Sequence, residues 1–159
     1  MKKYIFVFLL ISFNLNSSDI VSSFNKFIKF DLKFIQDTNN GFSSTQSFGQ
    51  IYRKENIIEI TVDSPSKEKY VIRDTFIEII DYDFNQTQKL DINNKDLIFI
   101  KLLTEGIDDI YVNNISQDSF VFENNDNKFH IKMLNESKFI VSFFDNMEYE
   151  NSILFETIN

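Results

Sequence analysis

The side chains that could take part in chemistry in this chain are one histidine and many carboxylates. His130 is the only histidine, and a metal or general-base role would need further nitrogen or sulfur groups beside it. The chain has no cysteine, which excludes a thiolate nucleophile, a disulfide scaffold and a cysteine metal site. No Gly-x-Ser-x-Gly elbow accompanies the histidine. His130 alternates with apolar neighbours in a strand-like run, so we expect it to face solvent.

The carboxylates could form a glycosidase pair or a calcium loop. The segment 81–85 lacks the glycine and the distal glutamate that a calcium loop requires. The 3 glycines lie too far apart to form a phosphate-binding loop. We interpret the acids as solvated turn residues and expect no enzyme activity, no metal and no cofactor. The acids weighed for these roles are Glu78, Asp81, Asp83, Asp108, Asp109, Glu148 and Glu150.

Composition favours one small globular domain. The 159 residues suit a single core, and 43% of them are hydrophobic, with 19 Phe, which is too apolar for a disordered chain. The formal net charge of −8 provides no basic surface for nucleic acid. We therefore expect a monomer that does not bind nucleic acid.

The N-terminus resembles a secretory signal. Lys2 and Lys3 precede an apolar run over 4–13, which is too short for a transmembrane helix. We expect a signal peptide over 1–18, a single domain over 19–159 and a periplasmic location. The alternatives are an uncleaved anchor or a buried N-terminal strand.

Hydrophobic periodicity predicts two helices and many short strands. Helical spacing covers 19–29 and 95–104; Asn94 is the expected N-cap of the second helix, and Gly106 follows its end. Alternation and polar breaks predict a mainly β, α+β fold: a curved antiparallel sheet or incomplete β-barrel, covered by the N-terminal helix and a mid-chain helical lid. Ordinary core packing of both helices is the alternative. The predicted strands are 30–35, 48–53, 57–62, 70–73, 76–80, 87–92, 110–115, 120–123, 129–133, 139–144 and 153–157.

Residues 19–106 contain a series of short motifs in a distinctive order and spacing. They are Asp19-Ile20, Asn25-Lys26, Phe30, Phe34, Gln36, Gly49-Gln50-Ile51-Tyr52-Arg53-Lys54, Ile57-Ile58-Glu59-Ile60, Pro65, Tyr70-Val71-Ile72-Arg73-Asp74, Tyr82-Asp83, Gln88 and Leu102-Leu103. Together they resemble the LolA family of outer-membrane lipoprotein carriers.

The resemblance implies a periplasmic chaperone that binds the acyl chains of lipoproteins in an apolar cavity and shuttles them from the inner to the outer membrane. The implied partners are acylated lipoproteins, an inner-membrane lipoprotein-releasing ABC transporter and an outer-membrane lipoprotein receptor. Inward strand positions and the helices should line the cavity, although each candidate could equally be a plain core residue. The candidates are Phe34, Ile51, Ile58, Ile60, Ile79, Ile98, Leu102, Phe120 and Phe122.

The chain departs from the family at the turn where an Arg-Pro pair is thought to hold the lid helices closed through backbone carbonyls. Lys54 or Glu55, with Asn56, occupies that turn. A lysine lacks the planar fork of an arginine, so Lys54 would replace it only in part. Arg53 is the other candidate, although alternation would point it to the opposite face.

Two further departures are Thr75, where the family has a glycine after Asp74, and an end at Asn159 without the family's C-terminal strand and loop. Two other functions remain open. One is a periplasmic lipid- or peptide-sensing regulatory domain of similar fold, and the other is a small secreted enzyme or adhesin.

Overall fold

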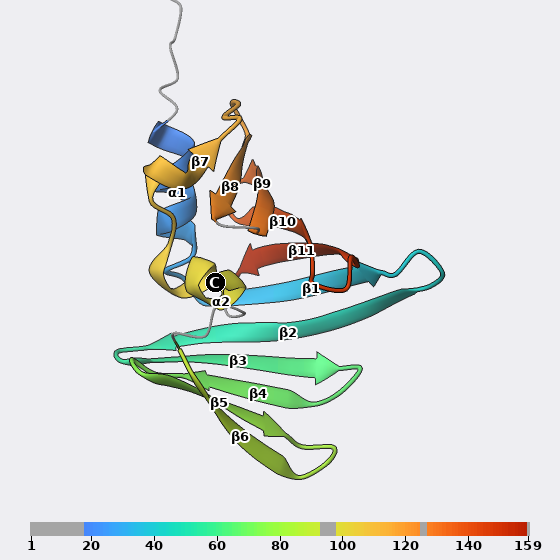
Figure 1. Ribbon diagram of the computed structural model, residues 1–159. Helices are drawn as coiled ribbons and strands as arrows, with labels where there is room; N and C mark the ends of the chain where they lie inside the picture. The colour runs from blue at the N-terminus through green and yellow to red at the C-terminus, as the bar shows by residue number, and fades with distance from the viewer. Residues whose placement is uncertain (1–17, 93–97, 125–126, 159) are drawn as a thin grey trace, which may run out of the picture.

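The computed structural model describes residues 18–92, 98–124 and 127–158. Two α-helices, one short 3-10 helix and eleven strands make up this part of the chain (Figure 1). The helices are α1 (Ser18–Phe27), α2 (Ile98–Glu105) and η2 (Asp109–Tyr111). The strands are β1 (Leu32–Asn39), β2 (Ser44–Lys54), β3 (Ile57–Ser64), β4 (Glu68–Ile72), β5 (Phe76–Asp81), β6 (Gln86–Asp91), β7 (Val112–Asn113), β8 (Ser119–Asn124), β9 (Asn127–Asn135), β10 (Lys138–Phe144) and β11 (Glu150–Thr157).

All strands belong to one antiparallel sheet in the order β6-β5-β4-β3-β2-β1-β11-β10-β9-β8-β7. The last strand, β11, lies at the centre and pairs with β1, so that Phe155 faces Phe34 across the ladder. Among the described strands no pairing joins β6 to β7, and the sheet therefore remains open. It curves around the two helices, as Figure 1 shows. The predicted fold class, a mainly β incomplete barrel with two covering helices, is confirmed.

Strand alternation produces the apolar concave face. In β1, Leu32 and Phe34 are buried while Lys33 and Ile35 are exposed. The ladder extends this pattern, because residues opposite one another in adjacent strands point to the same side. The concave face therefore continues from Phe34 into its neighbours on both limbs of the sheet, and the core lies between this face and the helices.

Helix α1 buries its apolar side against the limb formed by β8 to β11. Phe24 is 0% exposed and makes edge-on ring contacts with Phe120, at 5.8 Å between centroids, and with Phe139, at 5.1 Å. Phe27 adds a third such contact with Phe139. Edge-to-face pairs of this kind are favourable arrangements for aromatic rings. Helix α1 is thus a fixed part of the core.

The segment that follows α2 is fastened by a side chain of α1. The amide of Asn25 donates to the carbonyl of Ile107 and accepts from its N–H, both at 2.9 Å. Gly106 has a φ of 88°, and the Cβ of any other residue at this position would lie 2.6 Å from the Asn25 side-chain oxygen. Glycine is therefore required there both by backbone conformation and by space.

One predicted strand is wrong. Residues 110–115 were expected to be extended, but η2 and the two-residue β7 replace that strand. The carboxylate of Asp108 caps the N–H of Ile110 and favours a helical turn. Asn114, with a φ of 49°, follows the end of β7.

The proposed N-cap Asn94 and the segment 1–17 lie outside the described residues, so neither prediction is tested. No helix of the described chain is long and apolar enough to cross a membrane.

Candidate functional site

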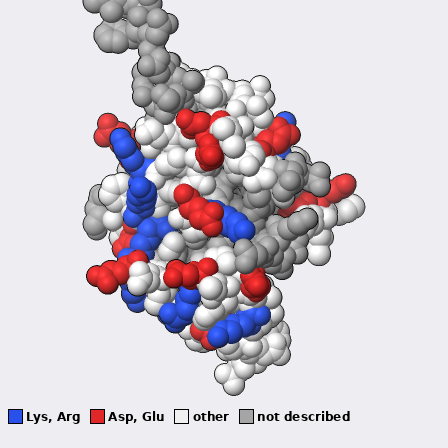
Figure 2. Space-filling view, turned by 60° about the vertical axis from the view of Figure 1, so that its left-hand side comes forward, with Lys and Arg blue, Asp and Glu red and all other residues white. Residues whose placement is uncertain are grey.

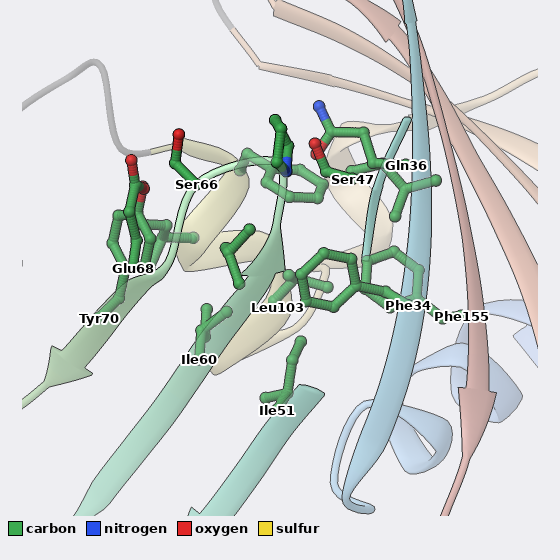
Figure 3. Close-up of a pocket in the computed structure, with 15 residues that line it drawn as sticks. Phe34, Gln36, Ser47, Ile51, Ile60, Ser66, Glu68, Tyr70, Leu103 and Phe155 are labelled. Carbon is green, nitrogen blue, oxygen red and sulfur yellow. The ribbon is translucent and has the colours of Figure 1, made fainter. Parts of the chain in front are cut away.

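The principal candidate site is an apolar cavity between the concave face of the sheet and α2. Its volume is about 410 Å³, which is within the range of small-molecule sites. Its floor includes Phe34, Ile51, Ile60 and Phe155. These residues come from β1, β2, β3 and β11, which are consecutive strands of the sheet. Figure 3 shows these side chains together below the polar end of the cavity.

The floor follows directly from strand register. Ile51 of β2 faces Ile60 of β3 across the ladder, and Phe34 of β1 faces Phe155 of β11. The two phenyl rings lie with centroids 6.1 Å apart. Phe34 and Ile60 are each 8% exposed, and Ile51 and Phe155 are each 1% exposed. The floor of the cavity therefore presents only hydrocarbon side chains.

The roof of the cavity is α2, which contributes Phe99, Ile100 and Leu103. The Phe99 ring stacks on Phe143 at 5.1 Å between centroids and on Phe129 at 6.0 Å. These contacts are purely apolar, so they could be exchanged for contacts with another apolar group at little net cost in free energy.

The open end of the cavity is polar. Gln36, Ser47, Ser66, Glu68 and Tyr70 gather there, and Figure 3 shows their polar atoms on one side of the apolar floor. The Tyr70 hydroxyl donates to Glu68 Oε2 at 2.5 Å. Burial, together with this carboxylate, raises the pKa of Tyr70, which keeps the hydroxyl protonated as a donor.

A hydrogen-bonded network orders the mouth on the β1 side. Asn151 is 3% exposed, and its Oδ1 accepts from Gln36 Nε2 at 2.9 Å and from Thr38 Oγ1 at 2.7 Å. Its amide nitrogen donates to the Tyr149 carbonyl at 3.0 Å. Among the residues that the structure describes, no buried side-chain polar atom lacks a partner. On this side the mouth is thus an ordered polar region above an apolar space.

Arg53 is the residue that ties the helices to the sheet. Its Nη2 donates to the Leu103 carbonyl in α2, and its Nε donates to the Phe30 carbonyl after α1, both at 3.0 Å. Burial lowers the pKa of Arg53, and the Asp31 carboxylate opposes that shift. The same carboxylate accepts the backbone N–H of Arg53 at 2.7 Å. One strand residue thereby satisfies carbonyls that a helix end leaves free.

The latch expectations need correction in their geometry. Lys54 does not reach the helices; its Nζ pairs with Glu59 of β3 at 3.1 Å. Arg53 was expected to point away from the latch position, but it lies on the same concave face as Ile51, two residues earlier, as strand alternation requires. Of the two latch candidates, Arg53 therefore contacts the helix carbonyls and Lys54 does not.

The predicted cavity residues divide into groups. Phe34, Ile51 and Ile60 line the cavity. Ile58 lines a second, more polar cavity of about 560 Å³ beside Arg53. Leu102, Phe120 and Phe122 are buried in the core instead, and Ile79 packs against that core. The side chain of Ile98 lies outside the described ones. Sequence reasoning missed Phe99, Ile100, Leu103, Val62, Ile153 and Phe155, which do line the cavity.

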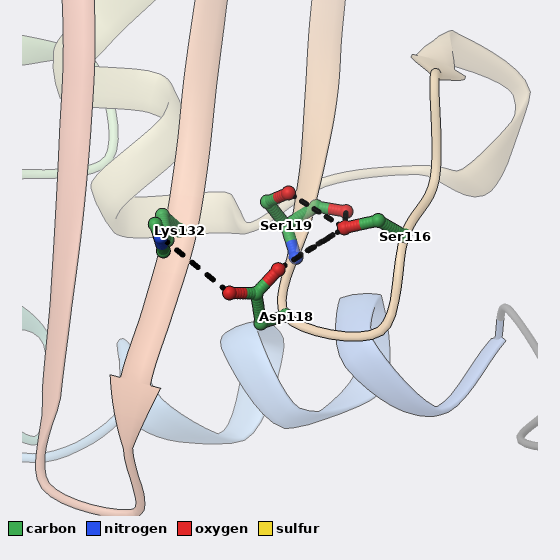
Figure 4. Close-up of polar contacts among 4 residues, drawn as sticks. All are labelled: Ser116, Asp118, Ser119 and Lys132. Carbon is green, nitrogen blue, oxygen red and sulfur yellow. Dashed lines mark hydrogen bonds and ion pairs between the residues drawn. The ribbon is translucent and has the colours of Figure 1, made fainter.

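The described part of the chain shows where the histidine and one of the surface acids lie. His130 is exposed, and no set of three or more potential metal ligands comes together there. Asp118 is typical of the acids: it accepts from Ser116 at 3.2 Å and pairs with Lys132 at 3.6 Å within a surface turn (Figure 4). On the face in Figure 2, acidic and basic side chains are interleaved, with no continuous patch of one sign.

Comparison with known proteins gives similarity only among solved structures. No protein-family model and no curated protein matches the chain. One similar structure is the LolA superfamily protein NE2245 from Nitrosomonas europaea, at 5% identity and TM-score 0.38, covering 88% of this chain and 91% of that one. Another is a DUF1329 family protein from Desulfovibrio piger, at 10% identity and TM-score 0.39, covering 90% of both chains.

Proposed function

We propose that this protein is a periplasmic carrier that binds the acyl chains of lipoproteins and shuttles them from the inner to the outer membrane. The observation that carries the proposal is the apolar cavity roofed by Phe99, Ile100 and Leu103 of α2. Its function is binding and release, with no chemical step. The order of motifs along residues 19–106, which resembles LolA carriers, supports the same function.

The contacts suit reversible binding. Each buried CH₂ group is worth about 0.8 kcal/mol, so acyl chains leave a membrane only for a site of similar apolar quality. Opening α2 would free the floor of Phe34, Ile51 and Ile60 for such chains. The incoming chains would replace the contacts that Phe99 and Leu103 make in the closed form. Because one apolar contact replaces another, the net free energy stays small enough for release.

Arg53 would hold the closed form. Its hydrogen bond to the Leu103 carbonyl must break before α2 can move away from β2. The energy of that latch then sets how readily the empty carrier opens. An inner-membrane ABC transporter would load the carrier, and an outer-membrane receptor would unload it.

The test is release of lipoproteins from energised spheroplasts of a Gram-negative host. Protein beginning at Asp19 is added, and acylated lipoprotein in the supernatant is measured together with its ratio to the carrier. We expect a soluble one-to-one complex. Ser47→Phe should prevent it, because Ser47 lies at the mouth of the cavity and a phenyl ring there would block entry.

The matched control is Ser44→Phe, an exposed position on the same strand that does not line the cavity. Release by all three proteins would exclude the cavity as the binding site. Absence of release with folded wild-type protein and a compatible transporter would contradict the carrier function. A stable complex with a single regulatory protein would instead favour the lipid- or peptide-sensing domain.

A further inference from the structure

The polar mouth of the cavity contains a carboxylate, an amide and three hydroxyls, and none of the described residues that line it is a cation. Glu68 is the one charged side chain that lines the cavity, and no Lys or Arg of the described chain joins it there. Lys67, its neighbour in sequence, is exposed and does not line the cavity. A ligand whose polar end is anionic would therefore meet a carboxylate with no compensating positive charge.

Strand geometry directs Glu68 toward the ligand space. One face of β4 carries Glu68, Tyr70 and Ile72, which are two residues apart along the strand. Ile72 on this face is buried in the core. In the ladder Glu68 faces Val62 of β3, which is itself a wall of the cavity. The carboxylate thus stands at the boundary between the apolar floor and the opening.

Tyr70 holds the carboxylate in place and leaves part of it free to accept. The hydroxyl hydrogen bond uses Glu68 Oε2, and a carboxylate can accept at both oxygens. Gln36 has a similar arrangement: its Nε2 donates to Thr38 and Asn151, while its Oε1 has no hydrogen bond among the described residues. Both free oxygens can only accept.

We propose that this mouth selects acyl chains whose polar end donates N–H groups and carries no negative charge, and that Glu68 is the residue that determines this specificity. An amide next to the acyl chain, as at the acylated end of a lipoprotein, meets that requirement, and so does an amine. Free fatty acids and anionic phospholipids do not. The inference rests on the proposed acyl-chain binding and specifies which acyl compounds the site accepts.

The selection works mainly by exclusion. Burying a carboxylate or phosphate beside Glu68 costs free energy because two like charges are brought together out of water. A donor gains a charge-assisted hydrogen bond instead. Repulsion of wrong ligands is an established route to specificity. In a compartment bounded by abundant phospholipid, such a mouth would keep the cavity available for lipoproteins.

The experiment compares four probes with matched chains: dodecylamine, lauramide, laurate and methyl laurate. Affinity is measured below the micellar concentration by displacement of an apolar fluorescent dye. We expect the amine and the amide to bind at least about tenfold more tightly than laurate, which corresponds to one charge-assisted hydrogen bond. Methyl laurate, with neither a charge nor a donor, should be intermediate.

Glu68→Gln tests the assignment without changing the shape of the site, since the new side chain retains an oxygen that can accept from Tyr70. It should reduce the preference for amine over laurate about tenfold and leave methyl laurate unchanged. Glu136→Gln is the matched control, because it removes the same charge at an exposed turn that does not line the cavity.

Three outcomes would overturn the inference. Equal affinity for the four probes would refute the selection and leave acyl-chain binding intact. An equal effect of Glu68→Gln and Glu136→Gln would assign the preference to overall charge. Absence of binding by every probe would refute the proposed function itself, and the selection with it.

Discussion

Arg53 and Leu103 are joined by a hydrogen bond of 3.0 Å, from a guanidinium N–H on β2 to a main-chain carbonyl in α2. The same guanidinium donates to Phe30, just after α1. A cation at the carboxyl end of a helix also interacts favourably with the helix dipole. The roof of the cavity is therefore fastened at one end by a single side chain of the sheet.

Arg53→Met should loosen this end of α2. Losing the hydrogen bond from this charged donor to the Leu103 carbonyl should lower the free energy of opening by about 1–3 kcal/mol, and amide hydrogens of residues 103–107 should exchange faster. Arg53→Lys should fall between wild type and Arg53→Met, because it keeps the charge without the fork. The exchange rates of these amides are measured by hydrogen–deuterium exchange in the wild-type protein and the two variants.

Lys54→Met is the control for this prediction. Lys54 pairs with Glu59 on β3 and does not contact the helix carbonyls. Its loss should leave exchange in residues 103–107 unchanged. Equal protection of α2 in wild type and Arg53→Met would contradict the latch.

Asn25→Ala should destabilise the whole domain. The Asn25 amide satisfies both the N–H and the carbonyl of Ile107, and Ile107 is buried at 6% exposure. Leaving those groups without partners should cost about 1–3 kcal/mol of unfolding free energy, measured by urea denaturation. Ser22→Ala, exposed on the same helix, should change it by less than about 0.5 kcal/mol. Similar midpoints for the two variants would show that Asn25 does not fasten the segment.

Gly49→Ala should be destabilising because two strands and a ring meet at this position. A Cβ there would lie 2.8 Å from Phe34 Cζ and closer still to the carbonyl oxygen of Thr61. Relief requires a shift of backbone, so we expect a loss of about 1–3 kcal/mol, again by urea denaturation. Ser44→Ala, at an exposed position of the same strand, is the control. A neutral Gly49→Ala would show that the sheet can widen here.

Much of the sheet could be predicted because its strands alternate cleanly. Phe34, Ile51 and Ile60 were expected to line the cavity of a LolA-like sheet because of their inward strand positions, and all three line the cavity. Arg53 could have been placed by the same rule, since it follows Ile51 by two residues on β2. The error came from measuring its direction against Lys54 at the turn and not along the strand.

Helix α2 could be predicted only in outline. The apolar residues of Ile98–Glu105 occupy consecutive positions, with Ile98 to Ile100 and Leu102 to Leu103 in two runs, so periodicity does not distinguish the side that meets the core from the side that faces the cavity. Leu102 was chosen, whereas Leu103 lines the cavity. Consecutive residues of a helix point about 100° apart, so an error of one position selects a different surface. Pairing of β11 with β1 could not be predicted either, because no local pattern specifies a contact between the two ends of a chain.

The stability of the β2–β4 region should depend on pH through Glu59. Its carboxylate accepts from Lys54 at 3.1 Å and pairs with Lys69 at 3.3 Å. The hydrogen bond from Lys54, followed by the interactions with Lys69, lowers the pKa of Glu59, while burial opposes the shift. A carboxyl whose pKa is lower in the folded state stabilises the fold above its unfolded-state pKa and loses that contribution as the pH falls through the folded-state pKa.

Glu59→Gln should therefore cost up to about 1 kcal/mol of unfolding free energy at neutral pH, since such partly exposed pairs are worth little. The difference from wild type should vanish in acid, below the folded-state pKa, where the wild-type carboxyl is also neutral. Urea denaturation at neutral and acidic pH measures both. Glu55→Gln, an exposed turn residue with no ion pair in the described chain, should show no such convergence. A constant difference for Glu59→Gln at all pH values would mean that shape, and not charge, is what this residue contributes.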